Sequence, residues 1–201
     1  MDYILKSLSD LDDRSLEGVA LLHQSVMHNL LADLGLPILL RYYQIARIES
    51  SVISFCAVSS STEILGWAIG SPDPYALNAR IQKPFVGFLK QMMALAVKRP
   101  LILLQLFSSV LSSSQENLPA NTVELTYIGV AKNVEGQGIG RALLNVFIEA
   151  SKSSGYHSVE LTTETDNLHA LALYEKSGFA IKRTFQEGRF KRYRMERKLS
   201  A

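Results

Sequence analysis

A single mixed α/β domain is the fold that these 201 residues predict, and two observations lead to it. The second half alternates runs rich in β-branched residues with segments whose apolar residues recur at helical spacing. Its order is strand, loop, helix, strand, helix and two closing strands, which packs helices in layers on one sheet. We therefore expect one domain over residues 1–201.

The helix that follows a glycine-rich loop is the clearest single element. It is expected over 138–153, with a buried stripe that comprises Ile139, Ala142, Leu143, Val146, Phe147 and Ala150. The strands are expected at 3–8, 51–59, 63–70, 122–130, 157–164, 179–185 and 189–199. The other helices are expected from about 13 to 30, with His23 in the apolar stripe, over 37–50 and over 167–178.

A helical insert is expected over about 75–119. Its longest apolar stretch, 84–111, is interrupted by Lys90, Lys98 and Arg99, and Pro100 divides it into two helices. No run reaches the ~18–20 apolar residues of a membrane-spanning helix. The apolar surface of the insert, with Met92 and Met93 in its first helix, is too large to leave in water, so we expect it to cover part of the fold, and a homodimer contact is the alternative.

Composition narrows the class of protein. Apolar residues make up 47% of the chain and charged residues 20%, the net charge is +2, and there is one cysteine. This balance is typical of a globular domain and gives no electrostatic reason to bind nucleic acid. A single cysteine cannot form an internal disulfide, and the first residues lack the features of a signal peptide, so a cytoplasmic protein is expected.

The stretch VEGQGIGRALL, residues 134–144, places Gly136, Gly138 and Gly140 where the helix begins. A helix N-terminus carries unpaired N–H groups, and glycine lets phosphate oxygens approach them without a side chain in the way. The stretch thus predicts a pyrophosphate site, with a glycine-rich turn that binds nothing as the alternative. It lacks the Lys-Ser/Thr of a P-loop, and neither possible spacing ends on the third glycine of a dinucleotide fingerprint.

Together with NLHALALYEKSGF at 167–179, this stretch resembles the two signature segments of the GNAT superfamily of acyl-CoA-dependent N-acyltransferases. The first is similar to the family's Gln/Arg-x-x-Gly-x-Gly/Ala loop. The second is similar to its Asn-x-x-Ala-x-x-x-Tyr-x-x-x-Gly-Phe segment, through Asn167, Ala170, Tyr174, Gly178 and Phe179. The resemblance covers 122–199 closely and 1–70 in element order only. It implies a mostly antiparallel, twisted sheet in which strands 122–130 and 157–164 run parallel and splay apart.

The resemblance also implies transfer of an acetyl group from acetyl-CoA to a primary amine, by direct attack in a ternary complex and without a metal. Pyrophosphate is expected on the backbone of the glycine loop, and the pantetheine arm along the end of strand 122–130. The expected cofactor-binding residues are Ile128, Gly129, Val130, Gly136, Gln137, Gly138, Ile139, Gly140, Arg141, Asn167 and Tyr174. Glu135 departs from the family's pattern, so Gln137 and Arg141 are the candidates for side-chain contacts to phosphate.

Two catalytic residues are implied by the same resemblance. Tyr174 stands where the family has a tyrosine near the thioester sulfur, and is expected to protonate the departing thiolate; a packing role is the alternative. Glu124 stands six positions before Val130, where members that acetylate histone lysines carry a glutamate, and is expected to take the amine's proton directly or through water. Alternation predicts that Glu124, Thr126, Ile128 and Val130 share one face. The N–H of Val130 is the implied oxyanion donor.

Several alternatives remain open. Glu160 and Glu164 are rival bases on the strand at 157–164. Cys56 lies among apolar residues of a strand and is expected in the core. The basic run 189–198 alternates its charges between two faces and is expected to be a solvated terminal hairpin. The four histidines have no metal-ligand spacing. A non-catalytic acyl-CoA-binding or regulatory module on the same fold is the alternative function. No motif identifies the amine acceptor, and we expect the helical insert to lie over the acceptor side of the cleft and help to shape the pocket.

Overall fold

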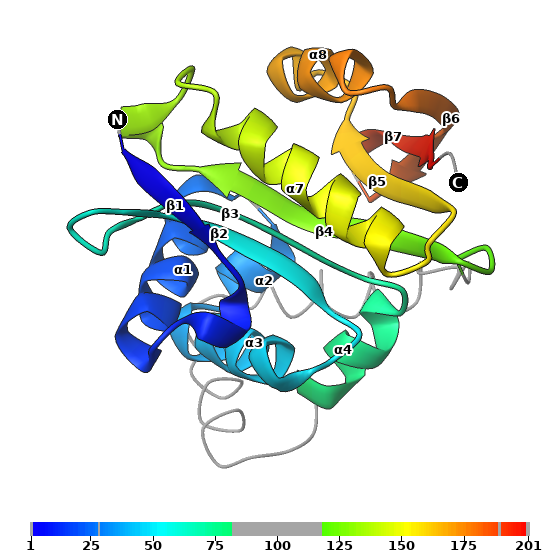
Figure 1. Ribbon diagram of the computed structural model, residues 1–201. Helices are drawn as coiled ribbons and strands as arrows, with labels where there is room; N and C mark the ends of the chain where they lie inside the picture. The colour runs from blue at the N-terminus through cyan, green and yellow to red at the C-terminus, as the bar shows by residue number, and fades with distance from the viewer. Residues whose placement is uncertain (1, 28, 82–117, 189, 200–201) are drawn as a thin grey trace.

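The computed structural model describes residues 2–27, 29–81, 118–188 and 190–199. In this part of the chain, seven strands form one sheet in the order β1-β2-β3-β4-β5-β7-β6, with helices on both faces (Figure 1). The strands are β1 Tyr3–Lys6, β2 Ile53–Ser59, β3 Ile64–Ser71, β4 Thr122–Val130, β5 Ser158–Glu164, β6 Ala180–Glu187 and β7 Phe190–Lys198. The α-helices are α1 Asp13–Val26, α2 Leu30–Asp33, α3 Leu36–Ile48, α4 Pro74–Ile81, α7 Ile139–Ser153 and α8 Leu168–Lys176. Two short 3₁₀-helices are η1 Leu8–Asp10 and η2 Lys132–Val134.

The strand pairing confirms the predicted mixed, mostly antiparallel sheet. β4 and β5 run parallel, while the other neighbouring strands of the described sheet run antiparallel. The strands predicted at 51–59 and 63–70 are β2 and β3, which pair with each other as an antiparallel hairpin. Of the predicted insert, α4 and residues 118–119 are described. Residues 82–117, with Met92 and Met93, lie outside the described residues, so the expectation about the insert's role stays a prediction.

Each face of the sheet carries its own hydrophobic core. α7 lies across one face, and α1 and α3 lie across the other (Figure 1). The core under α7 contains Leu143 and Phe147, and the core under α1 and α3 contains Tyr42, Tyr43 and Trp67. The sheet is therefore covered on both sides, which explains why every residue of β3 is buried.

The buried face of α7 is rotated slightly from the predicted stripe. Ile139, Leu143 and Phe147 are buried as expected, and Leu144 and Ile148 are buried with them. The other predicted members, Ala142, Val146 and Ala150, are half-buried. The reason is that α7 packs on several strands of a twisted sheet at once, which requires a wider apolar surface than one narrow stripe.

A β-bulge interrupts β4. Ile69 of β3 pairs with Tyr127, whereas the next residue, Gly70, pairs with Leu125, so Thr126 is the extra residue. A bulge shifts the alternation of side chains by one position. Leu125 accordingly packs in the core under α7, while Tyr127 packs against the core under α1 and α3.

Because of the bulge, the prediction that Glu124, Thr126, Ile128 and Val130 share one face is wrong. Ile128 and Val130 follow the extra residue and pack against the core under α7. Glu124 precedes it and alternates with Leu125, which points toward α7, so Glu124 lies on the opposite face, that of α1 and α3. A one-residue irregularity thus separates the candidate base from the side chains at the strand end.

The two closing strands differ in their surroundings, and the prediction of a solvated terminal hairpin is wrong for one of them. β6 is an edge strand with mostly exposed side chains. β7 is inserted between β5 and β6, so it is an inner strand. Arg194 of β7 is only 15% exposed and lies in ion pairs. Strand order, which the alternation of residues does not determine, places this basic side chain inside the molecule.

Within the described residues, none of the helices combines the length and the apolar composition that crossing a membrane requires.

Gly70 faces the bulge and has no room for a side chain. A Cβ there would lie 2.2 Å from the carbonyl oxygen of Glu124 and 2.5 Å from Cζ of Phe147. We expect Gly70→Ala to lower the free energy of unfolding by about 1–3 kcal/mol, the usual cost of overpacking, as measured by urea unfolding. Gly140→Ala is the control, because its Cβ would lie 3.5 Å from Val130, an ordinary contact. Equal stability of the two variants would contradict the packing argument.

Candidate active site

The ladder between β4 and β5 ends partway along both strands. Thr122–Leu125 pair with Ser158–Leu161, and both strands then continue, to Val130 and Glu164, without further pairing to each other. This confirms the predicted parallel splay. On its other edge β4 stays paired with β3 as far as Val130. The divergence therefore leaves one edge of the second half of β4 with backbone groups that β5 does not satisfy.

The direction of the backbone groups at the end of β4 follows from one hydrogen bond. The N–H of Ala131 donates to the carbonyl oxygen of Leu65 at 2.8 Å, toward β3. Successive N–H groups of a strand point to opposite edges, so the N–H groups of Val130 and Ile128 point into the gap. Gly129, between them, lies under Trp67: a Cβ at Gly129 would be 2.6 Å from the indole ring. Close packing against Trp67 therefore requires glycine at this position.

The glycine loop at the start of α7 presents its backbone to solvent. Gly136 and Gly138 have φ angles of 77° and 83°, a region that L side chains rarely adopt. A Cβ at either position would meet nothing within 4 Å. Gly138 is the N-cap of α7, and no side chain caps the helix there. The first N–H groups of a helix have no partner inside it, so this loop presents the donors that an anion requires.

The side chains of the loop divide into anchors and exposed groups. Val134 and Ile139 are buried, at 3% and 1% exposure, and hold the loop on the core at both ends. Glu135, Gln137 and Arg141 are exposed. The carboxylate of Glu135 therefore lies in water, where its charge is screened from a phosphate on the backbone. Gln137 and Arg141 remain free to reach such a ligand.

The end of β4, the first turn of α7 and α8 meet at one point. A Cβ at Gly140 would lie 3.5 Å from Cγ2 of Val130 and 3.8 Å from Cδ2 of Leu173. Leu173 belongs to α8 and directly precedes Tyr174. Three segments that are separate in the sequence thus converge beside the gap between β4 and β5.

Within α8, Asn167 and Tyr174 have distinct surroundings. The side chain of Asn167 accepts a hydrogen bond from the N–H of Ala170 at 3.2 Å, so Asn167 is the N-cap of α8. Tyr174 is buried, and its ring lies edge-on to Phe179 with centroids 5.9 Å apart. Burial raises the pKa of Tyr174 to about 12, so its hydroxyl is protonated at neutral pH.

Glu124 lies on the face of α1 and α3, next to the residues where β4 and β5 separate. Its side chain is 18% exposed, and its Oε2 is 2.8 Å from Nη1 of Arg194. Burial raises the pKa of Glu124 above its ordinary value, although the guanidinium of Arg194 opposes the rise. A carboxylate with a raised pKa is a better proton acceptor near neutral pH than an ordinary one.

The rival carboxylates are held differently. Burial opposes ionisation of Glu160, but hydrogen bonds from Lys182 and Arg194, both 2.6 Å long, outweigh it and lower the pKa of Glu160. Glu164 lies 4.0 Å from Nη2 of Arg192 at the far end of β5. A carboxylate that two cations hold ionised is the weaker base, so these surroundings favour Glu124 over Glu160.

The structure contains a buried aromatic cluster around His23 of α1 that was not predicted from the sequence. His23 is fully buried, and its Nδ1 is hydrogen bonded to the hydroxyl of Tyr43 at 2.7 Å. Its ring stacks on Trp67 and meets Tyr127 edge-on. Burial lowers the pKa of His23 to about 4, so the imidazole is neutral. The place of His23 in the predicted apolar stripe was the one signal of its burial.

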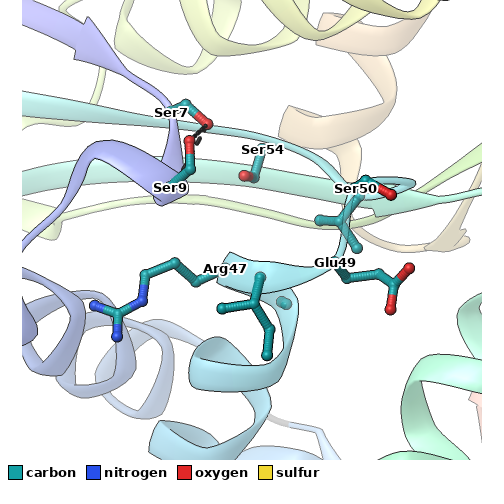
Figure 2. Close-up of a pocket in the computed structure, with 9 residues that line it drawn as sticks. Ser7, Ser9, Arg47, Glu49, Ser50 and Ser54 are labelled. Atoms are coloured by element: carbon teal, nitrogen blue, oxygen red, sulfur yellow. Dashed lines mark hydrogen bonds between the residues drawn. The ribbon is translucent and has the colours of Figure 1, made fainter.

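The other candidate sites in the described residues offer fewer groups that could bind or react with a ligand. No group of His, Cys, Asp and Glu there has the arrangement of a metal site. Cys56 is buried, as predicted, and burial raises the pKa of its thiol to about 12, which keeps it unreactive. Figure 2 shows a polar hollow between the turn after β1, the end of α3 and the start of β2. Its charged residues are neutralised, Arg47 by Asp13 and Glu49 by Arg80.

Comparison with known proteins agrees with this geometry. Residues 27–179, more than half of the chain, match the model of the Acetyltransferase (GNAT) family. The chain therefore belongs to this family of acetyltransferases. The family resemblance of the two glycine-containing segments is thereby confirmed.

Individual relatives match over shorter stretches or at lower identity. Over 61 residues, 30% of this chain, it is 39% identical to the mycothiol acetyltransferase of Jonesia denitrificans, and this stretch covers 19% of that protein. The structure of a GCN5-related N-acetyltransferase from Kribbella flavida superimposes with a TM-score of 0.63 at 15% identity over 98% of both chains. The ribosomal-protein-S18-alanine N-acetyltransferase from Escherichia coli gives 0.61 at 15% identity, over 100% of this chain and 96% of that one. At such identities the solved structures establish the fold alone.

The glycine loop can be tested with two glycines of the same helix. Gly138→Glu places a carboxylate on the exposed N-terminus of α7, and like charges ~4 Å apart repel by about 4 kcal/mol near a protein surface. We expect the affinity for coenzyme A to fall roughly 100-fold or more in isothermal titration. Gly155→Glu is the matched control: Gly155, after the C-terminus of α7, also has a positive φ and open space around its Cβ position. Wild-type affinity in Gly138→Glu would exclude the loop as the phosphate site.

Proposed function

We propose that this protein transfers an acetyl group from acetyl-CoA to a primary amine, by direct attack in a ternary complex. The observation that carries the proposal is the convergence of three parts at one gap: the open edge of β4, the uncapped N-terminus of α7 and α8 with Tyr174. Membership of the acetyltransferase family supports the same reaction class.

In this proposal coenzyme A is held largely by backbone groups. Its pyrophosphate binds the N–H groups from Gly136 to Arg141, where positive φ angles and the absence of a cap leave the donors accessible. Its pantetheine arm takes the place of the missing ladder partner along Ile128, Gly129 and Val130. The N-cap hydrogen bond of Asn167 holds the start of α8 in place beside the arm.

The chemical step uses two side chains of the protein, one as a base and one as an acid. The amine nitrogen attacks the thioester carbonyl carbon, so a C–N bond forms and the C–S bond breaks. The N–H of Val130, directed into the gap, donates to the oxyanion. One proton leaves the nitrogen for Glu124, and one passes from the Tyr174 hydroxyl to the departing sulfur. Both side chains then recover their starting states by proton exchange with water.

Glu124 is our preferred base, because its surroundings raise its pKa whereas those of Glu160 lower it. The base must be ionised to act, so activity is lost as the pH falls through the pKa of Glu124. We therefore expect the acid limb of the pH profile above the ordinary carboxylate pKa of 4.5.

The acceptor amine can be identified by a screen for turnover. Release of free thiol from acetyl-CoA would be followed with polyamines, amino sugars, amino acids, aminoglycosides and peptide N-termini. Turnover with at least one amine supports the proposal. Coenzyme A binding without thiol release for any amine would favour the non-catalytic acyl-CoA-binding module instead.

Tyr174→Phe tests the acid, since it keeps the ring in the core and removes the proton. General acid catalysis contributes ~100–10,000-fold, so kcat is expected to fall at least tenfold while the affinity for acetyl-CoA changes little. Tyr156→Phe is the control, because Tyr156 is a half-buried tyrosine that packs against the same core from the other end of α7. An unchanged kcat in Tyr174→Phe would remove this residue from the mechanism.

A further inference from the structure

Arg194 of β7 connects the candidate base to the rest of the sheet. Its Nη1 is 2.8 Å from Oε2 of Glu124 on β4, and its Nε is 2.6 Å from Oε2 of Glu160 on β5. The same Nη1 donates to Oγ1 of Thr162 at 3.1 Å. A single guanidinium thus bridges two strands at the place where their ladder ends.

The contacts of Glu124 leave its two carboxylate oxygens in different states. Oε2 is bound by Arg194, whereas Oε1 has no hydrogen bond or ion pair with any other described residue. An ionised carboxylate accepts through both oxygens. The oxygen that Arg194 does not hold is the one that can receive a proton.

We propose that Arg194 is a positioning residue for the transfer reaction: it fixes Oε2 of Glu124 and directs Oε1 toward the amine. The inference rests on the proposed function, with Glu124 as the base. It assigns a role to a residue of the basic run at 189–198 that the sequence alone left without one.

The guanidinium is itself held rigidly, which a positioning role requires. Arg194 is 15% exposed, and Glu160, its second partner, is 4% exposed. Lys182 binds the other oxygen of Glu160 at 2.6 Å and lies 3.9 Å from Glu196. The planar guanidinium fork binds in a defined orientation, which a lysine ammonium cannot do. Each member of this network is therefore fixed by at least one other.

The charge of Arg194 also adjusts the base. Burial raises the pKa of Glu124, Arg194 lowers it through charge and hydrogen bond, and the carboxylates of Glu160 and Glu187 raise it. The buried, neutral hydroxyls of Tyr42 and Tyr127 also lie near Glu124, and Arg192 lies near Tyr127. Removal of the Arg194 guanidinium takes away the charge and the hydrogen bond that lower the pKa of Glu124, so this pKa is expected to rise further.

Three variants separate orientation from charge. Arg194→Gln removes both, and is expected to move the acid limb of the kcat/KM–pH profile upward by about one unit or more and to lower kcat at least tenfold. Arg194→Lys keeps the charge but not the fork, so it is expected to lower kcat while the acid limb stays near its wild-type position. Arg197→Gln is the control: Arg197 lies on the same strand, and its Nη1 donates to the carbonyl oxygen of Ser177 at 2.7 Å rather than to a carboxylate of this network. We expect its acid limb to be unmoved.

The pKa of Glu124 can also be measured directly, in the absence of turnover. The carboxyl ¹³C resonance of Glu124, assigned by its loss in Glu124→Gln, is titrated by NMR in wild type and in the Arg194 variants. A higher pKa of Glu124 in Arg194→Gln than in Arg194→Lys is the expected result. Equal pKa values in wild type and Arg194→Gln would overturn the inference. If Arg194→Gln does not fold, the kcat of Arg194→Lys decides, and a wild-type kcat there overturns the positioning role.

The outcomes separate this inference from the function on which it rests. A wild-type protein that releases no thiol with any amine overturns the proposed function and the positioning role together. Turnover in the wild type, with the acid limb and kcat unaltered by both substitutions of Arg194, overturns the positioning role alone.

Discussion

The divergence of β4 from β5 beyond Leu125 is the constraint on which the rest of the site depends. Parallel strands normally satisfy each other's backbone groups along their whole length, and unpaired buried groups are costly. Here the second half of β4 keeps its bonds to β3 and opens its other edge. In the function that we propose, a pantetheine arm, which carries amide groups of its own, completes the ladder that the protein leaves unfinished.

The bulge at Thr126 determines toward which face of the sheet each side chain of β4 points. Before it, Glu124 points to the face of α1 and α3; after it, Ile128 and Val130 pack toward α7. Gly70 has no side chain, and this leaves room for the carbonyl oxygen of Glu124 at the bulge. A regular strand would have put Ile128 and Val130 on the same face as Glu124, that of α1 and α3, instead of on the core under α7.

The protein treats charge in two ways at this site. For the phosphate that we propose as its ligand, the loop offers backbone N–H groups and a helix N-terminus, and the one carboxylate of the loop, Glu135, remains in solvent. For its own buried carboxylates the protein supplies cations from β6 and β7, through Lys182 and Arg194. The first arrangement is local and the second spans the four strands β4, β5, β6 and β7, which explains why only the first leaves a short sequence motif.

The sequence by itself determined most of the described elements, the glycine loop and the burial of Cys56, because each depends on residues that are near neighbours in the chain or on one periodic pattern. The parallel splay was implied only by the family resemblance. The sequence did not determine the bulge in β4, the inner position of β7 or the ion pairs of Arg194. These depend on which strands become neighbours and in what register, and hydrophobic alternation reads the same for several strand orders. Only the tertiary structure decided them, because contacts between residues distant in sequence form when the sheet closes.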